Sequence, residues 1–336
     1  MLTFPLTAGV QVAQSVVADT YEEIVPFQFD RSGSRLKQRY TNEASKFVTV
    51  GETPIHYRIE GNPDGPTLLL IHGTYSSLHT WDDWIEQLGS EFRLVRLDMP
   101  GFGLTGPRKE GSHRLEMLIE TVGQFCDALG LENVAVAGNS LGGAVAWRLS
   151  IDRPDLVSRL VLIDAGGATL LSKLGRRYTP LGADIMPRYL TPRMTIRLIL
   201  KDAYGDPSKV TESLVRRYHD LLLRAGNRRA VIEIARNYQR EHDETDTFEF
   251  LNVRAPTLPS NYDHSPDPRD GYEISDVSVP ALFQWGSEDE WLPVSFGREL
   301  ASETSESVFY SYDGVGHIPM EESPKQTAED VAAFLT

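Results

Sequence analysis

The stretch of the sequence best suited to chemistry is residues 134–143, V-A-V-A-G-N-S-L-G-G. Small and β-branched residues at 134–137 predict a buried parallel strand, and the apolar residues after Ser140 predict a helix, so Ser140 falls at the turn between them. The glycines at 138 and 142 complete a G-x-S-x-G pattern, which is typical of a nucleophile elbow with a strained, exposed serine. A serine that merely caps a helix would suit the same turn. The nucleophile interpretation therefore depends on a base, an acid and an oxyanion site elsewhere in the chain.

A serine hydroxyl needs a base within hydrogen-bond reach. Functional groups of a parallel sheet gather at the carboxyl ends of its strands, which selects His72 and His317 among the eight histidines. His317 lies in the glycine-containing loop G-V-G-H-I-P and is the predicted base, whereas His72 is predicted to hold the oxyanion loop in shape. The remaining histidines are expected on the surface or in a cap: His56, His79, His113, His219, His242 and His264.

The acid that orients the base should also follow a strand. The sequence W-G-S-E-D-E at 285–290 places carboxylates directly after a predicted strand. We predict Asp289 as the acid, in preference to Glu288, Glu290 or the earlier strand-end Asp164. Acidic residues in such a place also suit a solvated turn.

Acyl transfer requires hydrogen-bond donors for the developing oxyanion, each contributing about 3 kcal/mol. The backbone amide of Leu141, at the start of a helix directly after the nucleophile, is one predicted donor. The amide of Thr74, just past His72, is the other. Tyr75 and Trp291 are expected to line the substrate pocket, although aromatic residues beside a site also serve as packing.

Strand and helix patterns alternate along most of the chain. Strands are predicted at 47–50, 55–59, 67–71, 92–97, 134–137, 160–163, 279–285 and 308–311, and helices at 84–88, 114–129, 141–153 and 328–335. This alternation is typical of an α/β protein with a mostly parallel, doubly wound sheet. It stops between about 167 and 272, where helical patterns at 194–200, 210–223 and 229–238 predict an inserted helical cap.

These patterns predict four parts of the chain: an N-terminal extension at 1–43, the first part of the core at 44–166, the helical cap at 167–272 and the second part of the core at 273–336. Within the extension, the charged residues 30–39 predict a linker. Residues 1–17 are amphipathic and are expected to dock on the protein's own body, with dimer contact or peripheral membrane contact as alternatives.

The composition narrows the classes of partner. A formal net charge of −15 would repel nucleic acid and anionic membranes. No run reaches transmembrane length, and residues 1–17 lack the basic start of a signal peptide, so a cytoplasmic location is expected. Cys126 is the only cysteine, which excludes an intrachain disulfide and a thiolate metal cluster. We expect no metal and no organic cofactor.

Taken together, the motifs resemble the α/β-hydrolase superfamily. They are G-N-S-L-G-G at 138–143, H-G at 72–73, D-M-P-G-F-G at 98–103, W-G-S-E-D at 285–289 and G-H-I-P at 316–319. The resemblance covers residues 44–336 apart from the cap and implies an α/β-hydrolase fold, with the candidate residues in the family's order of Ser, Asp and His. Haloalkane dehalogenases and epoxide hydrolases of this fold carry an aspartate at the elbow, so Ser140 argues against both.

The resemblance implies a serine hydrolase, and we expect a carboxylesterase acting on small to medium, largely apolar esters through an acyl-enzyme on Ser140. Meta-cleavage-product hydrolases share G-N-S but typically have H-G-G-G-P-G where this chain has H-G-T-Y-S-S, which makes carbon–carbon hydrolysis the alternative. A cofactor-free perhydrolase using the same triad and a non-hydrolytic scaffold for ligand sensing also stay open. The expected partner is a small-molecule ester, and a homodimer stays open as an alternative to a monomer.

Overall fold

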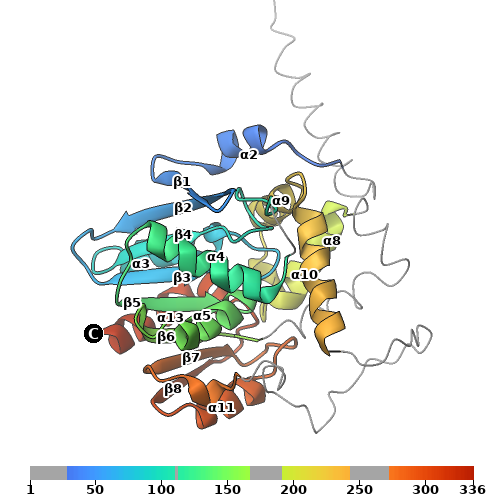
Figure 1. Cartoon of the computed structure of the whole chain (residues 1–336). Coiled ribbons are helices and arrows are strands. Elements are labelled where there is room, and N and C mark those ends of the chain that lie inside the picture. Colours follow the sequence, from blue (N-terminus) through green and yellow to red (C-terminus); the bar gives the residue numbers. More distant parts are fainter. Residues whose placement is uncertain (1–28, 110–112, 167–190, 243–271) are drawn as a thin grey trace, which may run out of the picture.

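A computed structural model describes residues 29–109, 113–166, 191–242 and 272–336. Its centre is an eight-stranded sheet in the order β1-β2-β4-β3-β5-β6-β7-β8 (Figure 1). The hairpin of β1 (Ser45–Val50) and β2 (Thr53–Gly61) is antiparallel, and β2 also pairs antiparallel with β4. All other neighbouring strands pair in parallel. The predicted mostly parallel sheet is therefore confirmed.

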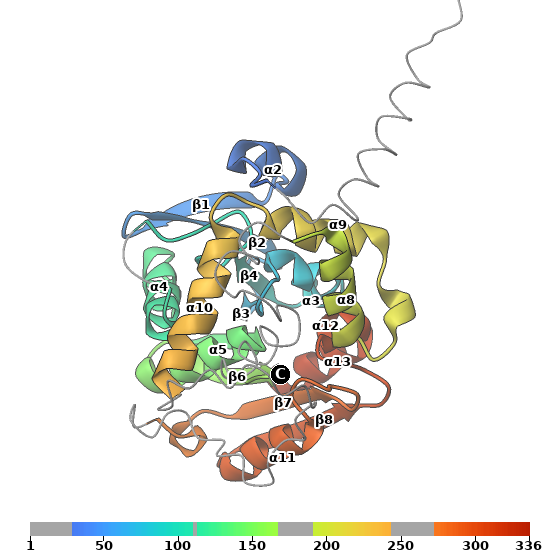
Figure 2. The same cartoon turned by 90° about the vertical axis from the view of Figure 1, so that its right-hand side faces the viewer.

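The inner parallel strands are largely buried because helices cover both faces of the sheet, whereas the edge strand of the parallel part, β8 (Ser307–Tyr312), is half exposed. The inner strands are β3 (Thr67–Ile71), β4 (Arg93–Leu97), β5 (Val134–Asn139), β6 (Val157–Ile163) and β7 (Ala281–Gly286). Helix α3 (Asp82–Leu88) packs with α13 (Pro324–Leu335), and α4 (Leu115–Ala128) packs with α5 (Leu141–Asp152) on the opposite side (Figure 2). Helix α11 (Val294–Glu303) covers β7 and β8. Residues 68–71 of β3 are completely buried as a result.

A layer of helices lies beyond one end of the strands, where the cap was predicted (Figures 1 and 2). This layer, which is called the cap below, contains α8 (Arg193–Ala203), η2 (Pro207–Lys209), α9 (Glu212–Leu222) and α10 (Asn227–His242). The described residues 191–242 hold no strand of the sheet. Residues 167–190 and 243–271 of the predicted cap lie outside the described residues.

The linker prediction for residues 30–39 is wrong, because these residues contain helix α2 (Gly33–Tyr40). Ser32 caps the helix by accepting a hydrogen bond from the amide of Arg35 at 3.4 Å. Leu36 is 2% exposed and packs in a small apolar cluster with Leu104 of the core and Leu221 of α9. The sequence pattern did not predict this helix because Leu36 is its one buried residue among many charged ones. The amphipathic segment 1–17 lies outside the described residues.

The segment around α2 is also fastened to the cap by a buried carboxylate. Asp220 of α9 is almost completely buried and accepts hydrogen bonds from Arg31 and, at 2.6 Å, from the hydroxyl of Tyr40. Arg39 lies 3.2 Å from the same carboxylate. The backbone of Arg31 pairs with the chain after α9, since its amide donates to Leu223 O at 2.6 Å. The extension therefore connects the cap to the outer edge of the core.

The lone cysteine and the lengths of the helices bear on two expectations drawn from the sequence. Cys126 of α4 is completely buried, and burial raises the pKa of its thiol to about 12, so it is a core residue as expected. Across the four described ranges, every helix is too short or too polar to cross a bilayer.

Replacing Asp220 with alanine should lower the free energy of unfolding by about 3 kcal/mol, because Arg31 and Tyr40 lose a charged, buried acceptor. Tyr40→Phe, which removes one donor, should cause a smaller loss. Chemical denaturation followed by circular dichroism measures both effects. Asp155→Ala is the matched control, since Asp155 pairs with Arg153 at the surface and its loss should leave the midpoint unchanged. Equal midpoints for D220A and D155A would show that the buried carboxylate does not anchor α2.

Candidate active site

Ser140 occupies the sharp turn between β5 and α5 that its sequence motif predicts. Its backbone has φ 53° and ψ −118°, a conformation that costs energy in a residue with a side chain. A Cβ added to Gly138 would lie 2.2 Å from Gly142 O, and one added to Gly142 would lie 2.2 Å from Ile71 O. The Ser140 amide donates to Ile163 O of β6 at 3.0 Å. The two glycines and the neighbouring strands therefore hold the serine in its strained conformation.

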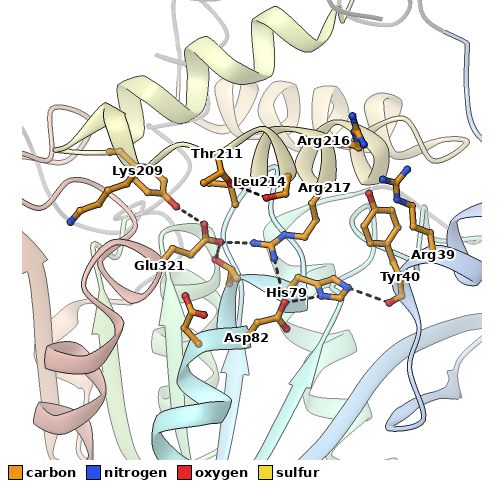
Figure 3. A pocket seen from close by; sticks show the side chains of 14 residues that line it. Arg39, Tyr40, His79, Asp82, Lys209, Thr211, Leu214, Arg216, Arg217 and Glu321 are labelled. Carbon is orange, nitrogen blue, oxygen red and sulfur yellow. Dashed lines mark hydrogen bonds and ion pairs between the residues drawn. The ribbon is translucent and has the colours of Figure 1, made fainter. Parts of the chain in front are cut away.

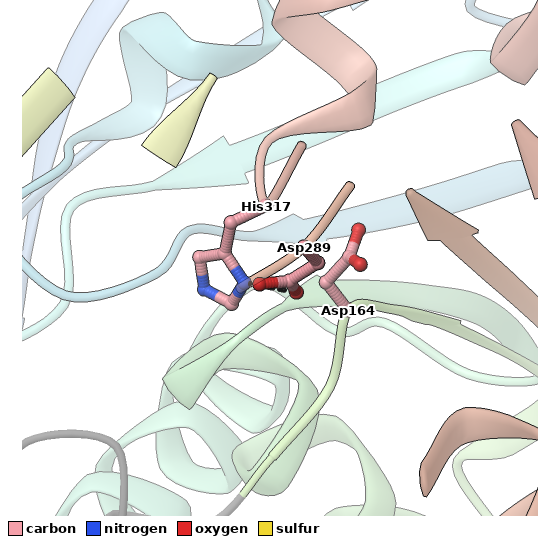
Figure 4. A group of neighbouring side chains, drawn as sticks. All are labelled: Asp164, Asp289 and His317. Atoms are coloured by element: carbon pink, nitrogen blue, oxygen red, sulfur yellow. Dashed lines mark hydrogen bonds and ion pairs between the residues drawn. The ribbon is translucent and has the colours of Figure 1, made fainter. Parts of the chain in front are cut away.

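His317 and Asp289 are hydrogen-bonded to each other at the carboxyl ends of the last strands (Figure 4). His317 Nδ1 lies 2.7 Å from Asp289 Oδ2. The imidazole therefore carries a proton on Nδ1, and this N–H donates a hydrogen bond to the carboxylate. Asp289 Oδ1 accepts from the amides of Trp291 at 2.8 Å and Leu292 at 3.0 Å. His317 Nε2 is buried and has no hydrogen-bond partner in the described part of the chain. This nitrogen is left with a lone pair, as a general base requires.

Asn139 connects the elbow to the loop of His317. Its side-chain amide donates to Ile163 O and to His317 O, both at 3.1 Å, and the residue is 3% exposed. Because Asn139 precedes Ser140 directly, these bonds place the histidine backbone beside the elbow. The sequence analysis did not assign this role to Asn139. The signal available was a lone amide side chain at the end of an otherwise apolar strand.

Glu322 of α12 (Pro319–Glu322) connects the same histidine loop to the cap. Its carboxylate accepts hydrogen bonds from the amides of Gly316 at 2.8 Å, Gly205 at 3.0 Å and Asp206 at 2.7 Å. The amide of His317 in turn donates to Ala203 O, the last residue of α8, at 2.6 Å. The sequence analysis missed Glu322, because only the folded chain brings these three amides to one carboxylate.

His72 holds the loop that carries Thr74. Its Nδ1–H donates to Gly73 O at 2.8 Å, and its Nε2 accepts from the amide of Met99 at 3.1 Å. Complete burial lowers the pKa of His72, so both contacts use a neutral ring. The Ser76 amide donates to Gly73 O at 3.3 Å and closes a turn in which Tyr75 has φ 62°. His72 is thereby a structural residue, as expected, and not a competing base.

Thr74 and Leu141, whose amides are the predicted oxyanion donors, belong to the two chain segments that adjoin Ser140. Leu141 is the first residue of α5, where amides have no acceptor within the helix. Thr74 lies in the turn after His72, and a Cβ added to the neighbouring Gly73 would lie 3.1 Å from Ser140 Cβ. The turn therefore passes directly beside the serine.

Trp291 lies against the candidate base. Its ring centroid is 4.8 Å from that of His317, and its indole N–H donates to Asp202 of α8 at 2.6 Å. The tryptophan thus supports the imidazole and contacts the cap at the same time. Tyr75 packs partly buried against the main core, and burial raises the pKa of its phenol to about 12. Glu288 and Glu290, the rejected acids, are exposed.

A metal would find few ligands here. Within the described residues, the one group of three or more carboxylate, imidazole or thiol side chains with metal-ligand spacing is Asp164, Asp289 and His317. The imidazole nitrogen on this side already donates its proton to Asp289. A metal ion would have to displace that proton, so the group suits proton handling better than ligation.

A polar pocket of about 460 Å³ lies at the junction of α2, α3, α9 and α12 (Figure 3). Arg217 of α9 enters it and lies 3.3 Å from an oxygen of Asp82 and 3.6 Å from one of Glu321. Glu321 also accepts from the hydroxyls of Tyr204 at 2.7 Å and Thr80 at 2.6 Å. The charged side chains that line this pocket therefore form ion pairs between the cap and the core.

Comparison with known proteins agrees with this geometry. Residues 66–324 match the family model described as the alpha/beta hydrolase fold. The chain belongs to the α/β-hydrolase family. An uncharacterized hydrolase, YugF, from Bacillus subtilis (strain 168) is 24% identical over 290 residues, covering 85% of this chain and 96% of that protein.

Two further similarities name reactions. The 2-hydroxy-6-oxo-6-phenylhexa-2,4-dienoate hydrolase of Comamonas testosteroni is 25% identical over 288 residues, covering 81% of this chain and 90% of the relative. A solved structure described as a membrane phospholipase A, a novel bacterial virulence factor, is 26% identical with a TM-score of 0.65. That similarity covers 97% of this chain and 96% of the other.

Gly142→Ala should destabilise the protein by more than about 2 kcal/mol, because the new Cβ would collide with two backbone oxygens, Ile71 O at 2.2 Å and His72 O at 2.5 Å. Gly123→Ala, inside α4, is the matched control: its Cβ would make ordinary contacts with Leu149 Cδ1 at 3.6 Å and Arg153 Nη1 at 3.9 Å, and alanine should stabilise the helix by about 0.5–1 kcal/mol. Thermal denaturation of both variants measures the difference. A Gly142→Ala variant as stable as the wild type would contradict the described elbow.

Proposed function

We propose that the protein is a serine hydrolase of carboxylic esters, with Ser140 as nucleophile, His317 as base and Asp289 as the acid that orients it. The observation that carries the proposal is the 2.7 Å hydrogen bond between His317 Nδ1 and Asp289, which leaves a buried Nε2 without a partner among the described residues, in a loop whose backbone bonds Asn139, the residue before the strained Ser140. A serine in a merely structural turn needs neither the strain nor an oriented imidazole.

The reaction follows from these positions. His317 Nε2 takes the proton of Ser140 as the serine oxygen attacks the ester carbonyl, and Asp289 stabilises the imidazolium that forms. The amides of Thr74 and Leu141 stabilise the oxyanion by about 3 kcal/mol each. His317 then gives its proton to the departing alcohol, which leaves an acyl-enzyme. Water activated by the same nitrogen releases the acid and restores Ser140.

The substrate proposed is a small to medium, largely apolar ester. Apolar and aromatic side chains adjoin the site, with Leu141 following the serine and Trp291 against His317. The similarity to a membrane phospholipase A supports ester chemistry, since such an enzyme is by definition a carboxylic ester hydrolase. An apolar acyl group is the part of such esters that this surrounding would bind.

Carbon–carbon hydrolysis is the second candidate. The dienoate hydrolase of Comamonas testosteroni is named as a hydrolase of a 2-hydroxy-6-oxo-dienoate, and its similarity covers 81% of this chain. The loop after β3 reads H-G-T-Y-S-S here, and its left-handed residue is Tyr75, which has a side chain where meta-cleavage-product hydrolases typically have small residues. We therefore rank ester hydrolysis first.

The proposal is tested with nitrophenyl esters from acetate to palmitate. Ser140→Ala and His317→Ala should each reduce turnover by at least about 10⁴-fold with an unchanged circular dichroism spectrum. Ser150→Ala, a buried serine whose hydroxyl bonds Trp147 O within α5, is the matched control and should keep wild-type turnover. A fluorophosphonate should label the wild type and not S140A. Wild-type rates in S140A would refute Ser140 as the nucleophile.

The two candidate reactions are separated by competition between an ester and a 2-hydroxy-6-oxo-dienoic acid. For an esterase, kcat/KM for the dienoic acid should be below about 1% of that for the best ester, a difference of at least about 2.7 kcal/mol in transition-state stabilisation. Spectrophotometry follows both reactions. A preference for the dienoic acid that depends on Ser140 would overturn the esterase proposal in favour of carbon–carbon hydrolysis.

A further inference from the structure

A second carboxyl group lies beside the Asp289–His317 pair. Asp164 follows β6, the strand next to β7, and its side chain is completely buried. One carboxyl oxygen of Asp164, one of Asp289 and a ring nitrogen of His317 all lie within 4.8 Å of one another (Figure 4). The proposed reaction uses only one of these two carboxyl groups.

The hydrogen bonds show which carboxyl group holds a negative charge. Asp289 receives the imidazole N–H and two backbone amides, as described above. Asp164 Oδ1 receives one amide, from Gly286 at 3.1 Å, and Oδ2 is buried with no hydrogen-bond partner among the described residues. Two buried carboxylates this close cannot both ionise without a large cost. The charge is therefore stabilised on Asp289.

The other groups that face Asp164 do not reverse this assignment. They are the acidic Glu322 of α12 and the phenol of Tyr312 at the end of β8, in addition to Asp289 and His317. Burial, followed by the negative charge of Asp289, raises the pKa of Asp164 well above its usual range. Of these neighbours, His317 is the one whose side chain can carry a positive charge, when its ring is protonated.

We propose that Asp164 is a positioning residue that holds a proton at neutral pH and directs it toward the Asp289 carboxylate, fixing the acid that orients His317. This rests on the proposed function. The proton resides on the otherwise unpartnered Oδ2 and converts a repulsive pair of carboxylates into a donor and an acceptor.

Asparagine is the natural mimic of a protonated aspartate here. Its oxygen can accept from Gly286, its NH₂ can donate toward Asp289, and it tolerates the left-handed backbone of position 164, where φ is 39°. We expect Asp164→Asn to keep kcat/KM within about 3-fold of the wild type, whereas Asp289→Asn should lose about 10³–10⁴-fold because the acid must be ionised. Asp164→Gly, which keeps the backbone conformation but removes the donor, should lower kcat by about 10–100-fold.

A thermal measurement keeps this test independent of the substrate. A carboxyl group with a raised pKa in the folded state favours folding below its unfolded pKa, and this advantage is lost as the pH rises toward the folded pKa. The melting temperature of the wild type should therefore fall relative to that of D164N between pH 5 and pH 8. An unchanged difference, or a D164N loss of activity equal to that of D289N, would overturn the proposal. The same fold-changes are expected in the rate of fluorophosphonate labelling, which is measured beside ester turnover, so a wrong ester substrate would not affect the result.

Discussion

The close backbone contact between the elbow and the strand beside it constrains the rest of the site. Gly142 lies against the carbonyl oxygens of Ile71 and His72, so that no side chain fits between α5 and the end of β3. This contact brings the start of α5, the strained Ser140 and the turn of Thr74 into one small volume. Small residues are required there for steric reasons alone, before any chemistry is considered.

Around this contact, buried acceptors act together with apolar packing to fix the more distant parts. Glu322 accepts hydrogen bonds from backbone amides of the cap and of the histidine loop. Glu321 accepts hydrogen bonds from hydroxyl groups and forms an ion pair with Arg217. Asp220 does the same for the segment around α2. A buried carboxylate whose acceptor positions are filled tolerates little displacement, because each lost bond leaves a desolvated charge. The cap and His317 are therefore mechanically coupled through α12.

In the candidate active site too, the number of hydrogen-bond donors differs between buried groups of the same type. Asp289 has three donors and sits next to the imidazole, whereas Asp164 has a single amide. His72, although close to the elbow, is neutral and fully used in backbone contacts. The candidate active site thus contains ionisable side chains that can exchange protons, and others of the same residue types that only fix the conformation of the loops.

The sequence by itself determined the features that depend on local pattern. Apolar runs of strand length gave the parallel sheet, and the glycines around Ser140 gave the elbow, because both are set by residues near one another in the chain. It misread residues 30–39, since one buried leucine among charges carries no periodic signal. Only the tertiary structure decided that Asp164 lies beside Asp289, that Asn139 bonds the His317 loop and that Glu322 joins cap to core. These contacts join residues up to 178 positions apart, and strand order, which no local pattern encodes, brings them together.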